Sequence, residues 1–268
     1  MPLAVCATPI GNLEDITLRV LTELRAADLV LCEDTRRTRI LLDRHGIDAR
    51  LLSYHAHNEA ARTEDVLQRL RGGDNIALVS DAGLPGVNDP GARLIAAAIA
   101  AAVPVTVLPG PSAVETALVA SGLVGERYQF LGYLPRRASE RRALAEALSG
   151  WPHAVVAFES PRRLPVSLAS LAEVMPERRA AVARELTKRF EEVARGTLAE
   201  LADRFREPPR GEVTLVLGET DVRGVAREGD AVEAVAELVV AGVPRRQAAA
   251  LVARLTGTTA NALYRASL

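Results

Sequence analysis

The chain has 268 residues, which is enough for two domains of ordinary size. Hydrophobic side chains make up 49% of the sequence and aromatic side chains only 3%, so the cores must be built mainly from Ala, Val and Leu. The formal net charge of −1 excludes nucleic-acid binding through a global basic field and leaves only local patches. No apolar run reaches 18 residues and no signal-peptide pattern is present, so we expect a soluble, cytoplasmic protein without a membrane segment.

The first half of the chain alternates short apolar runs with helical patterns. Strands are expected at residues 3–7, 29–32, 75–80 and 104–108. Helices are expected at residues 16–27, 38–45 and 58–71, from Ala92 onward, and after Ser112, where Ser112 and Glu115 match a capping box. Repeated strand–loop–helix units predict an α/β domain with a mainly parallel sheet, which we assign to residues 1–122.

The second half predicts another α/β domain at residues 123–220 and a helical tail at residues 225–268. Strands are expected at residues 129–133, 153–158, 180–185, 191–195 and 213–217, with helices at 139–148, up to 174, and at 198–205. In the tail, helices at 244–255 and 260–266 flank a Thr-Gly-Thr-Thr segment, which is helix-turn-helix spacing. An ordinary helical tail that packs on the body or on a partner subunit is the alternative interpretation.

Several common enzyme classes are excluded because their motifs are missing. The sequence has no G-x-G-x-x-G after the first strand, no Walker A motif and no G-x-S-x-G elbow. Cys6 and Cys32 lie in apolar runs and are expected to be buried free thiols. His55 and His57 form a close pair without further nearby ligands, so we expect no metal site.

Loops follow the predicted strands at residues 8–12, 80–91, 109–113, 158–163 and 184–188, and all but the last contain Gly or Pro. Ligands of open α/β sheets bind outside the carboxyl ends of the strands, so these loops are the candidate binding site. Asp81 directly follows a predicted buried strand. It either accepts hydrogen bonds from a ligand or caps its own loop, and the pattern does not distinguish the two.

Five ordered blocks of the sequence resemble the signature blocks of the tetrapyrrole-methylase superfamily. They are Ala7-Thr-Pro-Ile-Gly-Asn-Leu-Glu-Asp-Ile-Thr17, Cys32-Glu-Asp-Thr-Arg36, Val79-Ser-Asp-Ala-Gly-Leu-Pro-Gly-Val-Asn-Asp-Pro-Gly91, Pro109-Gly-Pro-Ser-Ala113 and Phe158-Glu-Ser-Pro-Arg-Arg-Leu164. The closest resemblance is to the branch that methylates ribosomal RNA, ribosomal RNA small subunit methyltransferase I. The likeness covers roughly residues 3–218, and Asn261-Ala-Leu-Tyr264 in the tail is also similar.

The resemblance implies two α/β domains, a homodimer and S-adenosylmethionine in the cleft between the domains. It implies methylation of the ribose 2′-hydroxyl of a decoding-centre cytidine in 16S ribosomal RNA of the small ribosomal subunit. By position, the cofactor contacts would be Thr8, Pro9, Ile10, Asp81, Gly83, Leu84, Ser112, Ala113 and Phe158. Two positions depart from the branch, because Phe158 stands where it often carries Tyr, and Leu84 where it often carries Thr. A lost hydroxyl would remove one hydrogen bond, on the order of 1 kcal/mol.

Lys188 is the candidate catalytic residue because it is the only lysine among 33 basic residues. A compact ammonium with a tunable pKa differs chemically from the guanidinium used everywhere else. We therefore expect Lys188 to act near the acceptor hydroxyl or a phosphate, although a single lysine can also fall here by accident. Glu185 is the second candidate, as a base or as a partner of Lys188. In a strand these two side chains face opposite sides, so a direct pair requires a turn at Leu186-Thr187.

RNA contacts are expected from arginines near the cleft loops and in the tail: Arg36, Arg37, Arg39, Arg162, Arg163, Arg245 and Arg246. Only Tyr54 and Tyr133 lie near the loops as aromatic side chains for base stacking. Two other functions stay open. One is a methyltransferase of the same fold that acts on a tetrapyrrole or a modified protein side chain, and the other is a non-catalytic RNA-binding module led by the tail.

Overall fold

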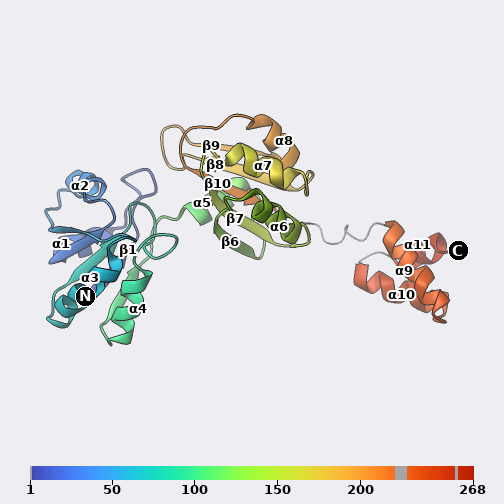
Figure 1. The fold of residues 1–268 in the computed structure, drawn as a ribbon, viewed down its shortest axis with the longest axis horizontal. Helices are drawn as coiled ribbons and strands as arrows, with labels where there is room; N and C mark the ends of the chain where they lie inside the picture. Colours follow the sequence, from blue (N-terminus) through green and yellow to red (C-terminus); the bar gives the residue numbers. More distant parts are fainter. Residues whose placement is uncertain (1, 221–227, 257–258) are drawn as a thin grey trace.

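The computed structural model describes residues 2–220, 228–256 and 259–268. Its first sheet has five strands in the order β3-β2-β4-β1-β5, and every pairing is parallel (Figure 1). The strands are β1 (Leu3–Cys6), β2 (Leu29–Cys32), β3 (Leu51–Ser53), β4 (Ile76–Val79) and β5 (Val105–Leu108). The predicted α/β fold with a parallel first sheet is confirmed, and β3 is a short strand that the apolar pattern did not reveal.

Helices cover both faces of this sheet because its strands are apolar on both sides. In β1, Leu3 and Val5 face the core that contains α3 (Glu59–Arg71) and α4 (Ala92–Ala100). Ala4 and Cys6 face the opposite core, with α1 (Leu18–Ala26) and α2 (Thr35–Arg44). This alternation is the two-residue period of a strand that is buried on both faces.

The strand order places a switch point at β1. This strand lies between β4 and β5, so the chain has added strands on both sides of it. Ligand sites of open α/β sheets lie outside the carboxyl ends of the strands at such a point. The loops after β1, β4 and β5, which carry three of the sequence blocks, meet at this edge.

The second sheet also has five strands, in the order β6-β7-β10-β8-β9. These are β6 (Tyr128–Tyr133), β7 (Ala154–Glu159), β8 (Arg179–Arg184), β9 (Glu192–Thr197) and β10 (Val213–Leu217). Only β6 and β7 are parallel, and the other pairings are antiparallel. One face packs on α6 (Ala138–Ser149), α7 (Leu164–Ala172) and α8 (Leu198–Arg204). The other face packs on α5 (Ala113–Ser121).

Helix α5 differs from the sequence interpretation in two respects. Ser112 is its N-cap, but the Ser112 hydroxyl contacts the Glu115 carboxylate and caps no backbone N–H, so the predicted capping box is not formed. The helix lies within residues 1–122, yet Val114, Ala117 and Leu118 pack on the second sheet. It therefore connects the two sheets, and the domain boundary at residue 122 stays a prediction.

The tail contains three described helices that share a small core: α9 (Glu228–Val240), α10 (Arg245–Thr256) and α11 (Ala260–Ala266). Helix α9 falls within the tail that the sequence predicted to be helical, but no separate bounds were predicted for it. The turn of the suggested helix-turn-helix includes residues 257–258, which lie outside the described residues, as do residues 225–227 at the start of the predicted tail. Within the described part of the chain, no helix is both long and apolar enough to cross a bilayer.

Candidate functional site

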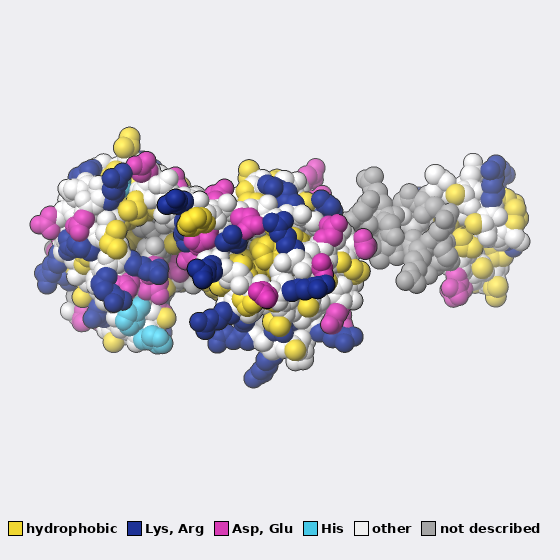
Figure 2. Space-filling view, turned by 90° about the horizontal axis from the view of Figure 1, so that it is seen from above, with side chains coloured by type: hydrophobic (Ala, Val, Ile, Leu, Met, Phe, Trp, Pro, Cys, Tyr) yellow, Lys and Arg dark blue, Asp and Glu magenta, His cyan; other side chains and the backbone are white. Residues whose placement is uncertain are grey.

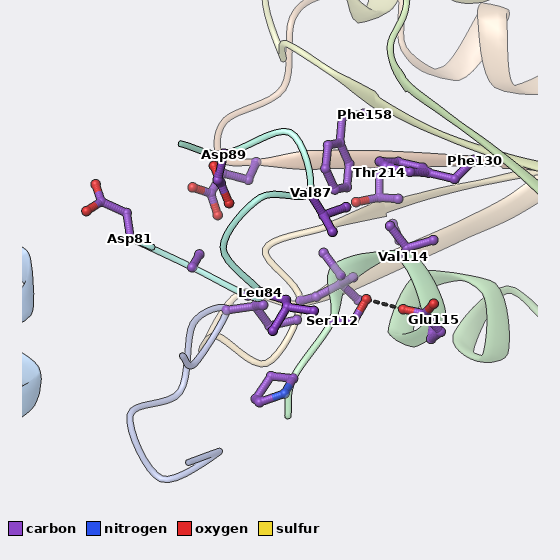
Figure 3. Close-up of a pocket in the computed structure, with 18 of the residues that line it drawn as sticks. Asp81, Leu84, Val87, Asp89, Ser112, Val114, Glu115, Phe130, Phe158 and Thr214 are labelled. Atoms are coloured by element: carbon purple, nitrogen blue, oxygen red, sulfur yellow. Dashed lines mark hydrogen bonds between the residues drawn. The ribbon is translucent and has the colours of Figure 1, made fainter. Parts of the chain in front are cut away.

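A cavity of about 800 Å³ lies between the carboxyl-end loops of the first sheet and the second sheet. Its volume falls in the range of small-molecule and cofactor sites, roughly 300–1,000 Å³. All five predicted strand-end loops contribute residues to its lining, together with β6, β8 and β10 of the second sheet. Of the cofactor contacts implied by the resemblance, these line the cavity: Ile10, Asp81, Gly83, Leu84, Ser112, Ala113 and Phe158 (Figure 3).

Thr8 and Pro9 do not line the cavity, and the structure gives Thr8 a positioning role. Its backbone N–H donates to the carbonyl of Gly83 at 2.8 Å, and the N–H of Gly83 donates back to the Thr8 carbonyl at 3.0 Å. The buried Thr8 hydroxyl donates to the Ser80 carbonyl at 3.0 Å. These bonds fasten the loop after β1 to the loop after β4, so Ile10 and Gly83 are held together on one wall.

The opposite end of the cavity is formed by α5 and three aromatic side chains. The phenol of Tyr128 donates to the Glu115 carboxylate at 2.7 Å, and the Ser112 hydroxyl contacts the same carboxylate. Burial acts to raise the pKa of Glu115, but these two hydroxyls outweigh it and the net pKa is lowered. Phe158 lies edge-on to Phe130, with ring centroids 5.0 Å apart. This end therefore combines an ionised carboxylate with an apolar aromatic wall (Figure 3).

The first-sheet end of the cavity is acidic. The Asp81 carboxylate accepts a hydrogen bond from the Asp34 N–H at 3.1 Å and pairs with Arg37 at 3.2 Å. Asp81 thus ties the loop after β2 to its own loop, yet it still lines the cavity, as Asp89 and Glu33 do. Burial, with the charges of Glu33 and Asp81, raises the pKa of Asp89 to about 6. Burial and Asp81 also raise the pKa of Glu33.

The loop after β7 is anchored by a fully buried carboxylate. Glu159 accepts from the Ser160 N–H at 2.6 Å and also bonds the Ser167 hydroxyl and the Arg163 guanidinium. Arg163 donates in addition to the Leu134 carbonyl at 3.1 Å. Its Nη1 is buried without a partner. Arg163 was expected to contact RNA, but its guanidinium forms an ion pair with Glu159 inside the protein. This pair holds the wall that carries Phe158.

Lys188 and Glu185 form a direct pair because the chain turns between them. Glu185 and Thr187 both adopt the left-handed conformation, with φ of 51° and 64°. The Lys188 ammonium lies 3.0 Å from Glu185 Oε1 and 2.8 Å from Glu212 Oε2. Burial acts to lower the Lys188 pKa, but the two carboxylates outweigh it and the net pKa is raised. Lys188 therefore keeps its proton, and it reaches the cavity through Glu212, which lines it.

The other arginines predicted to bind RNA differ in their exposure and in their distance from the cavity. Arg37 lines the cavity, and Arg36 is exposed and paired with Asp34 at 2.7 Å. Arg39 donates to the Ala49 carbonyl at 3.1 Å and does not line the cavity. Arg162 is exposed, and Arg245 and Arg246 begin α10 of the tail. Figure 2 shows basic side chains scattered among acidic ones, in line with the near-neutral net charge.

The exposure of the remaining candidates, two tyrosines and two cysteines, tests what the sequence predicted for them. Tyr54 is 1% exposed and bonded to Thr63 at 2.9 Å, so the expectation that it stacks on a base is wrong. Tyr133 is exposed at the cavity rim. Cys6 and Cys32 are buried free thiols. Among the described residues, no three or more His, Cys, Asp or Glu side chains are grouped as metal ligands.

Sequence reasoning missed several polar residues of the cavity, among them Glu33, Asp89, Glu212 and Tyr128. Glu33 and Asp89 stand inside quoted sequence blocks, so their place after β2 and β4 could have drawn attention to them. Glu212 precedes β10 in a stretch without any motif, and Tyr128 begins β6. Both reach the cavity only through the way in which the second sheet packs on the first.

Comparison with known proteins places the chain among methyltransferases. Residues 2–202 match the family model described as Tetrapyrrole (Corrin/Porphyrin) Methylases. A protein of Mesorhizobium japonicum named ribosomal RNA small subunit methyltransferase I is 45% identical over 98% of this chain and 90% of its own length. The Escherichia coli O157:H7 protein of the same name is 42% identical over 99% of this chain and 94% of its own length.

Solved structures show the same fold at low sequence identity. The uroporphyrin-III C-methyltransferase of Thermus thermophilus, complexed with S-adenyl homocysteine, has a TM-score of 0.57 and 18% identity. The match covers 81% of this chain and 97% of that one. The described part of the tail adds helices α9, α10 and α11 to the body formed by the two sheets.

Proposed function

The chain belongs to the tetrapyrrole (corrin/porphyrin) methylase family, and on that premise we propose that it methylates RNA of the small ribosomal subunit. The proposed reaction transfers a methyl group from S-adenosylmethionine to the ribose 2′-hydroxyl of a cytidine in 16S ribosomal RNA, as the sequence blocks imply. The observation that carries the proposal is the 800 Å³ cavity, because the sequence blocks that resemble this family converge on its walls. Relatives at 42–45% identity over nearly the whole chain support the ribosomal substrate.

The residues present fit a cationic nucleoside cofactor. S-adenosylmethionine supplies a methyl group on a positively charged sulfur, and it carries an ammonium and an adenosine. Asp81, Glu33 and Asp89 give one end of the cavity a negative potential, which favours a cation there. Phe158, Ala113 and Val114 offer an apolar wall to a purine ring. Ile10, Gly83, Leu84 and Ser112 complete the set that we propose holds the cofactor.

The contribution of the protein to methyl transfer is mainly positioning. Holding two reactants in line can supply roughly 7–11 kcal/mol of the barrier. The fastened loops after β1 and β4 fix one wall, and the buried Glu159 fixes the loop that carries Phe158. Both walls are therefore held by hydrogen bonds within the protein itself, as positioning requires.

Protonated Lys188 cannot serve as the base that accepts the proton of the ribose hydroxyl. We propose instead that its ammonium holds the Glu212 carboxylate at the cavity wall and, with Glu185, fixes the charge there. A carboxylate so placed accepts a hydrogen bond from the ribose hydroxyl, orients it and takes its proton as the O–CH3 bond forms, which is the role we assign to Glu212. Lys188 and Glu185 remain the proposed catalytic group, acting as a unit with Glu212.

For the RNA, we propose that Arg36, Arg37 and Arg162 hold phosphates around the cavity, since each is exposed or lines it. Arg39, Arg245 and Arg246 stay predictions for more distant contacts, and Arg163 acts through Glu159. Binding through these arginines should fall steeply with salt.

We further propose that the chain forms a homodimer and that it acts in the cytoplasm. Light scattering would test the oligomeric state, and cell fractionation would test the localisation.

Calorimetry with S-adenosylmethionine tests the cofactor site. We expect micromolar binding by the full chain and a loss of about tenfold in Asp81→Asn, which removes one negative charge from the acidic end. Asp74→Asn is the matched control, because Asp74 pairs with Arg69 at 2.7 Å and does not line the cavity. If the unaltered chain binds no cofactor, the methyltransferase proposal is wrong.

Mapping of ribose methylation tests the substrate. Small subunits from cells that lack this protein should miss one 2′-O-methylcytidine, and the purified chain should restore it. Lys188→Arg should lower the rate at saturating subunits, since the larger planar guanidinium cannot hold both carboxylates at the positions that a single ammonium nitrogen gives them. An unchanged rate in Lys188→Arg would remove Lys188 from the mechanism and leave the substrate assignment intact.

A further inference from the structure

Tyr133 stands at the rim of the cavity with most of its ring in solvent. Its exposed fraction is 62%, although the residue ends a strand and lines the cavity. Among the other aromatic residues that line the cavity, Phe130 and Phe158 are partly buried, and Tyr128 is 41% exposed with its hydroxyl bonded to Glu115. An exposed aromatic ring beside a concave site is a typical contact for a planar ligand.

The backbone of β6 is built so that Tyr133 reaches this place. The register with β7 shifts between Phe130 and Tyr133, and Gly132 adopts a φ of 69° within the irregular segment. A Cβ at position 132 would lie 3.0 Å from Oδ1 of Asn88, in the loop after β4. Beyond the bulge, the Leu134 N–H donates to the Phe158 carbonyl at 3.2 Å. Bulges next to sites commonly redirect a side chain in this way.

The ring of Tyr133 is supported from one side by other aromatic rings. Its centroid lies 5.6 Å from that of Phe158, with an interplanar angle of 62°. Phe158 in turn contacts Phe130 at 5.0 Å with an angle of 69°. Edge-to-face contacts of this kind fix ring orientation. Tyr133 is therefore the outermost member of a row of three rings that leads from the cavity wall to solvent.

We propose that Tyr133 is a substrate-binding residue on which the base of the acceptor nucleotide stacks. The inference rests on the proposed function, since it places the base attached to the methylated ribose. A ribose that enters the cavity leaves its base at the rim, where the exposed ring lies. A base within a duplex cannot reach such a site, so the nucleotide must be unstacked or flipped out. Stacking on an aromatic side chain is the usual way in which proteins hold such a base.

Three substitutions separate stacking from the filling of space. Methylation of small subunits from cells that lack the protein is measured with the full-length variants. Tyr133→Ala and Tyr133→Leu should raise the KM for subunits about tenfold, because neither side chain has a π-face. Tyr133→Phe should stay within about twofold of the unaltered chain. Trp151→Ala is the matched control, since Trp151 is 37% exposed, contacts His153 edge-on and does not line the cavity.

Two further measurements accompany the kinetics. Calorimetry with S-adenosylmethionine should show affinities within about twofold for all Tyr133 variants, and light scattering should show one oligomeric state. The proposal is overturned if Tyr133→Leu behaves like Tyr133→Phe, if cofactor affinity falls as much as KM rises, or if the oligomeric state changes. If the unaltered chain neither binds the cofactor nor methylates subunits, the proposed function fails, and this inference fails with it.

Discussion

Replacement of Gly11 by alanine would force apart two loops that contact each other, the loop after β1 of the first sheet and the turn between β8 and β9 of the second. Gly11 follows Ile10 in the loop after β1 and packs against the turn between Glu185 and Lys188. A Cβ at this position would lie 2.6 Å from Lys188 Cγ, 2.6 Å from Thr187 Oγ1 and 2.7 Å from the Leu186 carbonyl oxygen. The lysine stem can rotate away, but the carbonyl belongs to a backbone held by several hydrogen bonds.

The expected cost of Gly11→Ala follows from that crowding. Overpacking of this kind destabilises by about 1–3 kcal/mol. The hydrogen bond from the Asn12 N–H to Thr187 Oγ1, 2.9 Å long, would be lost as the loops separate, which adds about 1 kcal/mol. For a chain of this size, each kcal/mol lowers Tm by roughly 2–4 °C. We also expect about tenfold weaker binding of S-adenosylmethionine, since closing the loops around the ligand would cost about 1.4 kcal/mol.

Scanning calorimetry and titration calorimetry measure the two effects. Gly150→Ala serves as the matched control, because Gly150 follows α6 with a φ of −93° and a Cβ there has open space around it. We expect this control to stay within about 0.5 kcal/mol of the unaltered chain. The reasoning is refuted if Gly11→Ala and Gly150→Ala melt within 1 °C of each other and bind the cofactor equally well.

Three further predictions concern buried groups. Glu159→Gln should lower the free energy of unfolding by about 3–5 kcal/mol, since it leaves Arg163 charged and unpaired in the interior; a loss below 1 kcal/mol in urea titrations would contradict this. Because the pKa of Asp89 is raised to about 6 in the folded chain, the folded state binds more protons than the unfolded state between about pH 4 and 6. As the pH rises from about 4 to 6, the free energy of unfolding of the unaltered chain should therefore fall by about 1–2 kcal/mol relative to that of Asp89→Asn, after allowance for solvent screening. A difference between the two proteins that does not change with pH would count against this prediction. Burial raises the pKa of Cys6 to about 12, so iodoacetamide at pH 8 should modify neither Cys6 nor Cys32 in the native chain and both in urea, as mass spectrometry would show.

The pairing of Lys188 with Glu185 shows how far sequence reasoning carried. The composition singled out Lys188, and strand geometry stated the condition for a direct pair, a turn at Leu186-Thr187. The left-handed conformations of Glu185 and Thr187 meet that condition. The partner that brings Lys188 to the cavity, Glu212, is 24 residues away, directly before β10, and no local pattern indicates it.

Aromatic residues and arginines illustrate the reverse case. Tyr54 and Tyr133 were equivalent in the sequence, yet Tyr54 is buried under α3 and bonded to Thr63, whereas a β-bulge presents Tyr133 at the rim. Arg162 and Arg163 are neighbours in one block. Arg162 is exposed, while Arg163 turns inward to Glu159. Burial of a particular side chain depends on which element packs over it, and that is a property of the whole fold.

The sequence by itself predicted that apolar strands alternate with helices and with loops that contain glycine and proline. This alternation predicted a parallel first sheet with a ligand-binding site at the carboxyl ends of its strands. Periodicity and turn chemistry are local, so they are legible in a chain without coordinates. Tertiary structure alone decided that α5 packs on the second sheet, that three carboxyls crowd one end of the cavity, and that Tyr133 remains largely in solvent while Tyr54 is buried. Each of these depends on contacts between segments far apart in the chain, where packing and desolvation act and local pattern is silent.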